Sequence, residues 1–177
     1  MKKPLLALGT LALALSATVS AETLRFATDA SYAPFSKPGA DGKMTGFDPD
    51  IAQALCAAMK AKCEVVPQDF DGIIPALNAK KFDAVIASMN ITEERKKAVD
   101  FSDKYYNMAS RLVAKQGSQV NPAWFKGKKI GVLRSSIQEK YARDTFVKLG
   151  AQLVTYGKAP ESFMDLKAGR VDAAFVD

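Results

Sequence analysis

The feature that most constrains the fold is a short pattern that occurs twice. Residues 77–84 read LNAKKFDA and residues 166–173 read LKAGRVDA. In both places the pattern predicts the end of a helix, followed by an Asp-Ala pair that enters a buried strand. Strands and helices also alternate along the rest of the chain, which predicts an α/β fold with parallel sheets. The repeat therefore indicates two similar α/β lobes.

Turn and cap signals predict where the elements begin and end. Asp48 followed by Pro49 predicts a helix that begins at this pair, with Asp48 as its N-cap. Ser136 and Glu139 predict a capping box at the start of a later helix, which Gly150 is expected to end. Residues 30–44 read as loop, and strands are expected at residues 24–27, 64–67, 83–87, 130–133, 153–156 and 171–176.

The first 21 residues have the pattern of a secretory leader. Lys2 and Lys3 precede an apolar run at residues 5–15, and residues 19–21 read VSA, which predicts cleavage after Ala21 and export. The apolar run is too short to span a bilayer. The expected organisation is a signal peptide at 1–21, a first lobe at 22–109, a hinge strand and linker at 110–120, and a second lobe at 121–177. Because the chain stops where a strand reaches the predicted site, we expect a fragment whose second lobe is incomplete.

Composition narrows the chemistry that the chain can perform. It has no histidine and two cysteines, Cys56 and Cys63. An even cysteine count in an exported chain predicts a disulfide, and two thiols without histidine argue against a metal site. The net charge is +6, but the basic residues occur in scattered pairs without interleaved aromatic residues. This distribution predicts a solvated surface rather than a nucleic-acid interface.

The strongest candidate for a binding site is residues 84–95, AVIASMNITEER. An apolar strand ends in the polar residues Ser88 and Asn90, Thr92 can cap the helix that follows, and Arg95 lies one turn into it. Free helix N–H groups and a guanidinium together suit a small carboxylate, which arginine binds through two parallel hydrogen bonds. The alternative is that Arg95 pairs with Asp100 on the surface and the polar run is an ordinary loop.

The repeat supplies a second half to this candidate site. Aligning Asp83 with Asp172 places Ser88 and Asp177 at equivalent strand ends of the two lobes. Ligands of open parallel sheets bind at the carboxyl ends of strands. If these ends face each other across a hinge, a guanidinium from one lobe and a carboxylate from the other suit a zwitterion. The alternative is a chance similarity of two βα turns.

Several motifs, taken in order, resemble one family. Together with the leader they resemble the periplasmic amino-acid-binding proteins of ABC importers, most of all the lysine/arginine/ornithine- and histidine-binding branch. The motifs are residues 28–35 (TDASYAPF), 46–50 (GFDPD), 70–75 (FDGIIP), 91–95 (ITEER) and 168–173 (AGRVDA). The resemblance implies a periplasmic-binding-protein-like fold of type II, in which two lobes joined by a hinge close around one amino acid. It also implies a periplasmic monomer without a cofactor that passes its ligand to an inner-membrane permease complex.

The resemblance also implies a role for each candidate residue. Arg95 holds the ligand's α-carboxylate with help from Ser88, Asn90 and the helix N-terminus at Ser136 and Ile137, and the α-ammonium goes to Asp177 and Ser88. The aliphatic stem lies between Tyr32 and Phe70, Asp29 meets a distal cation, and the wall of the second lobe is formed by Leu133 and Gln138. The spacing of Cys56 and Cys63 matches the disulfide of this branch. For Tyr32 and Phe70 the alternative is ordinary core packing, and for Asp29 it is a turn residue.

Two other function classes are compatible with the sequence. The first is a periplasmic enzyme on the same fold, resembling the cyclohexadienyl dehydratases, which would need a positioned general acid. Without histidine, carboxylates, lysines and tyrosines remain for that role. An aspartate flanked by aromatic residues favours a cationic ligand instead. The second is the sensor domain of a receptor, against which we note that no transmembrane segment follows in the sequence. The favoured hypothesis is a binding protein for arginine, lysine, ornithine or histidine.

Overall fold

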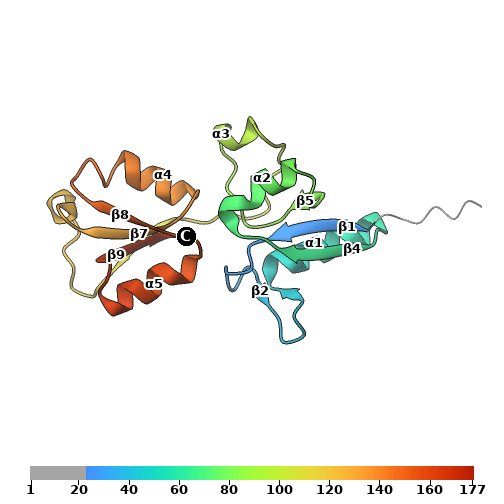
Figure 1. The fold of residues 1–177 in the computed structure, drawn as a ribbon, viewed down its shortest axis with the longest axis horizontal. Helices are drawn as coiled ribbons and strands as arrows, with labels where there is room; N and C mark the ends of the chain where they lie inside the picture. Colours follow the sequence, from blue (N-terminus) through green and yellow to red (C-terminus); the bar gives the residue numbers. More distant parts are fainter. Residues whose placement is uncertain (1–22) are drawn as a thin grey trace, which may run out of the picture.

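Two α/β lobes, joined by an extended crossover, make up the described part of the molecule (Figure 1). The computed structural model describes residues 23–177, so the predicted leader and its cleavage after Ala21 lie outside the described residues. None of the helices in the described range has the length and apolar composition needed to cross a bilayer. Each lobe has its own sheet, with helices packed on both faces.

The first lobe is built on β1 (Leu24–Thr28), which lies between β4 (Cys63–Pro67) and β5 (Ala84–Val85) in a parallel sheet. Successive residues of a strand point to opposite faces. Phe26 packs with Ala52 of α1 (Phe47–Met59), whereas Ala27 packs with Ile73 of α2 (Ile73–Asn78). The two helices therefore cover opposite faces, and the carboxyl ends of the strands point toward the second lobe (Figure 1).

Two expectations for the first lobe are wrong in detail. The predicted loop at residues 30–44 contains most of a small antiparallel hairpin, β2 (Lys37–Pro38) and β3 (Met44–Thr45). Asp48 is not the N-cap of α1, because the helix begins at Phe47 and its cap is Gly46 with φ 123°. A Cβ at Gly46 would lie 2.6 Å from the carbonyl oxygen of Phe35, so this entry to the helix requires glycine. The lobe is completed by two short helical turns, η1 (Phe70–Gly72) and α3 (Glu93–Lys96).

The second lobe repeats the plan of the first with one added strand. Its sheet has the order β6-β9-β7-β8, with β6 antiparallel to β9 and the other pairs parallel. Ile130 and Val132 are fully buried on the face covered by α4, and Ala174 packs against Leu166 of α5 on the other face. The elements are β6 (Arg111–Ala114), η2 (Pro122–Phe125), β7 (Lys129–Leu133), α4 (Ile137–Asp144), β8 (Gln152–Tyr156), α5 (Ala159–Ala168) and β9 (Ala173–Val176).

The start of α4 is close to the prediction, but its end is not. Ser136 Oγ accepts a hydrogen bond from the N–H of Glu139 at 3.1 Å, as expected for an N-cap. The carboxylate of Glu139 accepts from the N–H of Ser135, one residue before the cap, so the reciprocal bond of a capping box is displaced. The helix ends at Asp144, and residues 145–150 form turns that reach Gly150 without a further helical segment.

A disulfide joins Cys56 and Cys63, with the two Cα atoms 6.1 Å apart, which confirms the predicted pair. It links the last turn of α1 to the first residue of β4. Because Cys63 pairs with Leu24 at the start of β1, the bridge lies at the amino ends of the strands. The candidate site lies at their carboxyl ends, on the opposite side of the lobe.

Candidate functional site

Tyr32 links the first lobe to one of the two strand ends that the repeat aligned. Ser88 follows β5 in the first lobe, and Asp177 follows β9 in the second. The hydroxyl of Tyr32, in the first lobe, donates a hydrogen bond to Asp177 Oδ2 at 3.0 Å. A side chain of the first lobe therefore reaches the end of the last strand of the second.

Arg95 is held by main-chain groups of both lobes. Thr92 caps α3, since its Oγ1 accepts from the N–H of Arg95 at 3.1 Å, and Arg95 is the third residue of this four-residue helix. The guanidinium donates to the carbonyl of Asn90 at 2.7 Å and to the carbonyl of Ser135, in the second lobe, at 2.9 Å. Its carbon also lies 5.4 Å from the ring centre of Phe70. The alternative pairing with Asp100 is not among the ion pairs of the described residues.

The surroundings of Arg95 form an interlobe groove. A hollow of about 810 Å³ is lined by Arg95 and α3 on one side and by Ser135, Ser136 and Ile137 at the N-terminus of α4 on the other. Burial lowers the pKa of the Arg95 guanidinium, whereas the charges of Glu94 and Asp177 raise it. A guanidinium facing a helix N-terminus is an arrangement that favours an anion.

Asp177 is the acceptor for groups from three parts of the chain. Besides Tyr32, its carboxylate accepts hydrogen bonds from Gln138 Nε2 and from Ser110 Oγ, the latter at 3.3 Å. Gln138 is buried in the first turn of α4, and Ser110 precedes β6. The burial of Tyr32 and the charge of Asp177 both raise the pKa of the Tyr32 hydroxyl, so it remains a donor.

Asp29 is a buried carboxylate at the end of β1. It is 3% exposed, and its Oδ1 accepts from the N–H of Ser31 at 2.9 Å and from Ser31 Oγ at 2.8 Å. Burial raises the pKa of Asp29 above its ordinary value; the Ser31 bonds lower it, the charge of Asp69 raises it and that of Lys158 lowers it. Within residues 23–177, no lysine or arginine forms an ion pair with Asp29.

The remaining predicted residues lie around the same gap, although their roles stay predictions. Tyr32 stacks on Phe35 with ring centres 5.2 Å apart, while Phe70 lies against Arg95. The expected sandwich of a ligand between Tyr32 and Phe70 therefore rests on the resemblance. Leu133 ends β7, and its carbonyl accepts from Ser136 Oγ at 2.6 Å, so it adjoins the N-terminus of α4.

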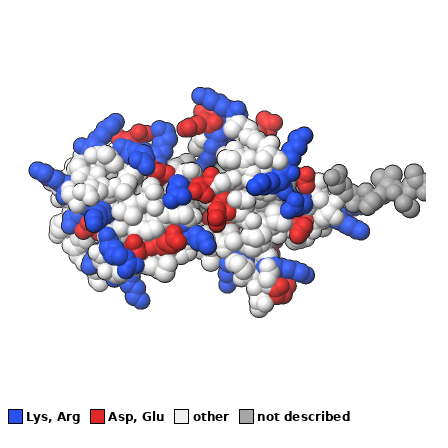
Figure 2. Space-filling model, viewed as in Figure 1, with Lys and Arg blue, Asp and Glu red and all other residues white. Residues whose placement is uncertain are grey.

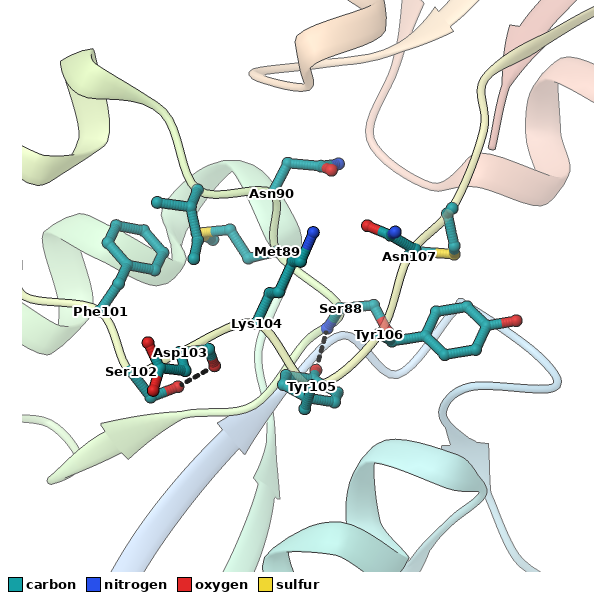
Figure 3. Close-up of a pocket in the computed structure, with 12 residues that line it drawn as sticks. Ser88, Met89, Asn90, Phe101, Ser102, Asp103, Lys104, Tyr105, Tyr106 and Asn107 are labelled. Carbon is teal, nitrogen blue, oxygen red and sulfur yellow. Dashed lines mark hydrogen bonds between the residues drawn. The ribbon is translucent and has the colours of Figure 1, made fainter.

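Sequence reasoning missed two residues that contact Ser88. The hydroxyl of Ser88 donates to the carboxylate of Asp48, with both oxygens at 3.0 Å, and its N–H donates to the hydroxyl of Tyr105 at 2.9 Å. The bond between Ser88 and Tyr105 lies beside a cavity of about 240 Å³ lined by residues 88–91 and 101–108 (Figure 3). These partners are 40 and 17 positions from Ser88 in the sequence, so no local pattern signals them.

The visible charged surface carries both signs in alternation. Figure 2 shows lysine and arginine side chains spread over both lobes, with aspartate and glutamate between them. Several of these side chains form exposed pairs within one helix, such as Lys140 with Asp144 at 2.8 Å. In the part of the chain that the structure describes, no group of three or more acidic or cysteine side chains is placed to hold a metal ion.

Comparisons with known proteins identify the family. A family model described as bacterial extracellular solute-binding proteins, family 3, matches residues 24–154. The chain is 46% identical over 180 residues to an L-arginine-binding protein of Pseudomonas aeruginosa, covering 99% of this chain and 70% of the relative. It is 45% identical over 184 residues to the lysine/arginine/ornithine-binding periplasmic protein of Escherichia coli, covering 100% and 70%.

Solved structures agree with the sequence relatives. An ancestral arginine-binding protein bound to arginine superposes with a TM-score of 0.82 at 43% identity, covering 88% of this chain and 70% of that one. The expected α/β fold with two lobes is thereby confirmed, and the chain spans about 70% of the length of these relatives. The chain belongs to the bacterial extracellular solute-binding proteins, family 3.

Proposed function

We propose that the protein is a periplasmic solute-binding protein that captures a cationic L-amino acid, namely arginine, lysine, ornithine or histidine, for an ABC importer. The observation that carries the proposal is the convergence of Arg95 and Asp177, of opposite charge, on one gap between the lobes. Relatives at 45–46% identity are named for arginine and for lysine, arginine and ornithine, which agrees with this ligand class.

The backbone of the ligand binds through its two charges. Arg95 takes the α-carboxylate, assisted by Ser88, Asn90 and the N-terminus of α4 at Ser136 and Ile137. Asp177 and Ser88 take the α-ammonium. Support comes from the groove that Arg95 shares with the start of α4, and from the influence of the Asp177 charge on Arg95. Charge-assisted hydrogen bonds at both poles make the site selective for a zwitterion.

The distal end of the ligand is read by Asp29. A cationic partner stabilises the charged form of a buried carboxylate whose pKa is raised by desolvation, because the partner replaces part of the lost hydration. Tyr32 and Phe70 contact the aliphatic stem of the ligand, and Leu133 and Gln138 form the wall on the second lobe. The same aspartate makes turnover of an anionic carbocycle, the enzymatic alternative, a poorer fit to the site.

Binding couples to closure of the two lobes. Arg95 already reaches Ser135, and Arg134 forms an ion pair with Asp71 at 3.1 Å, so the closed arrangement has contacts of its own. A ligand held by Arg95 on one side and Asp177 on the other adds a further bridge. The boundaries 22–109, 110–120 and 121–177 describe the moving parts in this scheme. The proposal also includes export with cleavage after Ala21 and a monomeric state. The protein delivers its ligand to a membrane permease and has no nucleic-acid partner.

The test is a thermal-shift screen of the twenty amino acids and ornithine, followed by calorimetry. A ligand at a hundred times its Kd stabilises the folded protein by about 2.7 kcal/mol, so binding raises the midpoint of unfolding measurably. We expect the basic amino acids to give the largest shifts. If none of the twenty-one compounds shifts the midpoint, the proposal is wrong.

Arg95→Ala should weaken binding of the best ligand roughly thirtyfold or more, because it removes the charged partner of the ligand's α-carboxylate from a partly buried site. The matched control is Lys96→Ala, which removes a neighbouring exposed cation on the same helix and should leave the Kd unchanged. Circular dichroism verifies that both variants fold. Retained affinity in a folded Arg95→Ala variant would contradict the assignment of the carboxylate site.

A further inference from the structure

Asp48 is a buried carboxylate for which the binding scheme above has no use. It is fully buried in the first turn of α1, where its side chain does not cap the helix. Burial raises the pKa of Asp48, and the hydrogen bonds from Tyr105 and Ser88 lower it. A carboxylate in such a place is retained at a free-energy cost unless its hydrogen bonds are satisfied.

Asp48, Ser88 and Tyr105 form a closed triangle of hydrogen bonds. The Tyr105 hydroxyl donates to Asp48 Oδ1 at 2.8 Å and accepts from the N–H of Ser88 at 2.9 Å. The Ser88 hydroxyl donates to the same carboxylate at 3.0 Å. A hydroxyl has one hydrogen to donate and two lone pairs to accept with. Since the carboxylate can only accept, it fixes the direction of both hydroxyl hydrogens.

The triangle also holds an unusual backbone conformation at the candidate site. Ser88 has φ 46°, in the left-handed region that residues with a Cβ adopt at a cost of about 1 kcal/mol or more. Its N–H is fixed by Tyr105, which belongs to the stretch between α3 and β6 through which the chain crosses to the second lobe. The turn at the strand end is therefore tied both to α1 and to the crossover.

We propose that Asp48 is a positioning residue of the amino-acid site, which commits the Ser88 hydrogen to itself and so presents the Ser88 lone pairs to the α-ammonium of the ligand. This inference rests on the proposed function, because it assumes that Ser88 contacts the ammonium. Asp48 acts through Ser88 and does not touch the ligand. Its negative charge, one hydroxyl away, adds to that of Asp177 in balancing the ammonium.

Asp48→Asn is the variant that tests the orientation of the hydroxyl. The asparagine amide keeps one acceptor but carries no charge, and its N–H₂ group can donate to Ser88 Oγ and occupy a lone pair. Hydrogen bonds to charged groups are strong enough that we expect arginine to bind roughly ten- to a hundredfold more weakly. The matched control is Asp50→Asn, an exposed carboxylate in the same helical turn, which should leave the affinity unchanged.

The decisive readout compares two ligands by calorimetry. The first is arginine, and the second is 5-guanidinopentanoic acid, which has the same carboxylate and guanidinium but no α-amino group. Asp48→Asn should change the Kd of the second ligand less than twofold, because that ligand has no ammonium for Ser88 to accept from. An equal loss for both ligands would mean that Asp48 supports the fold alone, and an unchanged Kd for arginine would also overturn the proposal.

A second measurement uses Ser88→Ala and compares the arginine affinities of the single and double variants. It needs no ligand analogue and does not rely on Asp48→Asn alone. In the Ser88→Ala protein, Asp48→Asn should add less than a twofold further loss of arginine affinity, because the hydroxyl through which Asp48 acts is gone. If the loss of arginine affinity in the double variant equals the product of the two single losses, Asp48 does not act through Ser88. A wild-type protein that binds none of the basic amino acids would refute the proposed function itself, whereas a binding wild type with multiplying losses refutes this inference alone.

Discussion

At the scale of single residues, the site combines charges that differ in burial, because Asp29 is buried, Arg95 is half-buried and Asp177 is exposed. Main-chain groups engage Arg95 and Asp29, whereas the side chains of Tyr32, Ser110 and Gln138 engage Asp177. Asp29 is the clearest case, because its raised pKa shows that burial outweighs the two hydrogen bonds from Ser31. Such a group lowers the stability of the protein unless a cation joins it.

Asp29→Asn should therefore stabilise the ligand-free protein while weakening its affinity for arginine and lysine. A carboxyl whose folded-state pKa is raised binds protons more tightly in the folded state than in the unfolded state. Its destabilising effect is complete above the folded-state pKa and disappears as pH falls below it toward the ordinary value of 3.8. We expect the midpoint of unfolding at neutral pH to rise, and the Kd for basic ligands to rise by about tenfold.

The same group predicts a pH dependence of binding. As pH falls through the raised pKa, Asp29 takes up a proton and arginine affinity declines in the wild type, but this component is missing in Asp29→Asn. Asp41→Asn replaces an exposed carboxylate in the β2–β3 hairpin and serves as the control, so its Kd for arginine should change with pH as in the wild type. Parallel pH profiles of calorimetric Kd in all three proteins would exclude Asp29 as the reader of the cation.

At the scale of elements, most of the helix and strand boundaries that were predicted correctly follow from short sequence patterns. Short patterns predicted the Thr92 and Ser136 caps, the strand end before Asp177 and the disulfide, and the structure contains each of them. The strand expected at residues 83–87 is shorter than predicted, because β5 ends at Val85, three residues before Ser88. What could not be predicted depends on distant partners. Asp48 has the sequence of a helix cap, but Ser88 and Tyr105, 40 and 57 positions away, engage its carboxylate instead.

The predicted end of the helix that follows Ser136 fails for a related reason. Gly150 has φ 92° and is a valid stop signal, but the helix has already ended at Asp144. Phe146 turns into the core and stacks on Phe125 with ring centres 4.4 Å apart. Packing of that ring, which the periodicity of the sequence does not reveal, decides where the helix stops.

The disulfide should contribute to stability and not to binding. Replacing both Cys56 and Cys63 with alanine removes a cross-link between residues seven positions apart, which the chain-entropy model values at about 2–3 kcal/mol. Because the bridge lies at the amino ends of the strands, the Kd for the best ligand should stay within a factor of two. Urea unfolding and calorimetry measure the two quantities. A large loss of affinity in a folded variant would mean that strain passes through the sheet to the site.

At the scale of the whole molecule, the lobes are joined by contacts between their facing edges. Tyr32 with Asp177, Arg95 with Ser135, and Arg134 with Asp71 each connect the first lobe to the second. The pair of Arg134 and Asp71 differs from the others because both of its side chains are charged, and these side chains are 52% and 28% exposed. An ion pair in that position is open to screening by salt.

Arg134→Ala should consequently weaken ligand binding slightly, about two- to fivefold at low salt, by removing a contact made between the lobes. The difference from wild type should shrink in 1 M salt, where the screening length is about 3 Å. Arg170→Ala, which breaks the exposed pair with Asp165 inside the second lobe, is the control and should not change the Kd. A salt-independent difference would point to lost packing instead of lost charge.

The hydrogen bonds that hold Arg95 in place lower the free-energy cost of ordering this side chain when a ligand binds. Two of the five N–H groups of a guanidinium are engaged by the carbonyls of Asn90 and Ser135, one from each side of the gap. The Arg95 side chain is thus fixed by the main chain before a ligand binds, so the ligand does not have to order it. Because this preorganised guanidinium loses little conformational entropy on binding, more of the free energy of its contacts with the ligand appears as affinity.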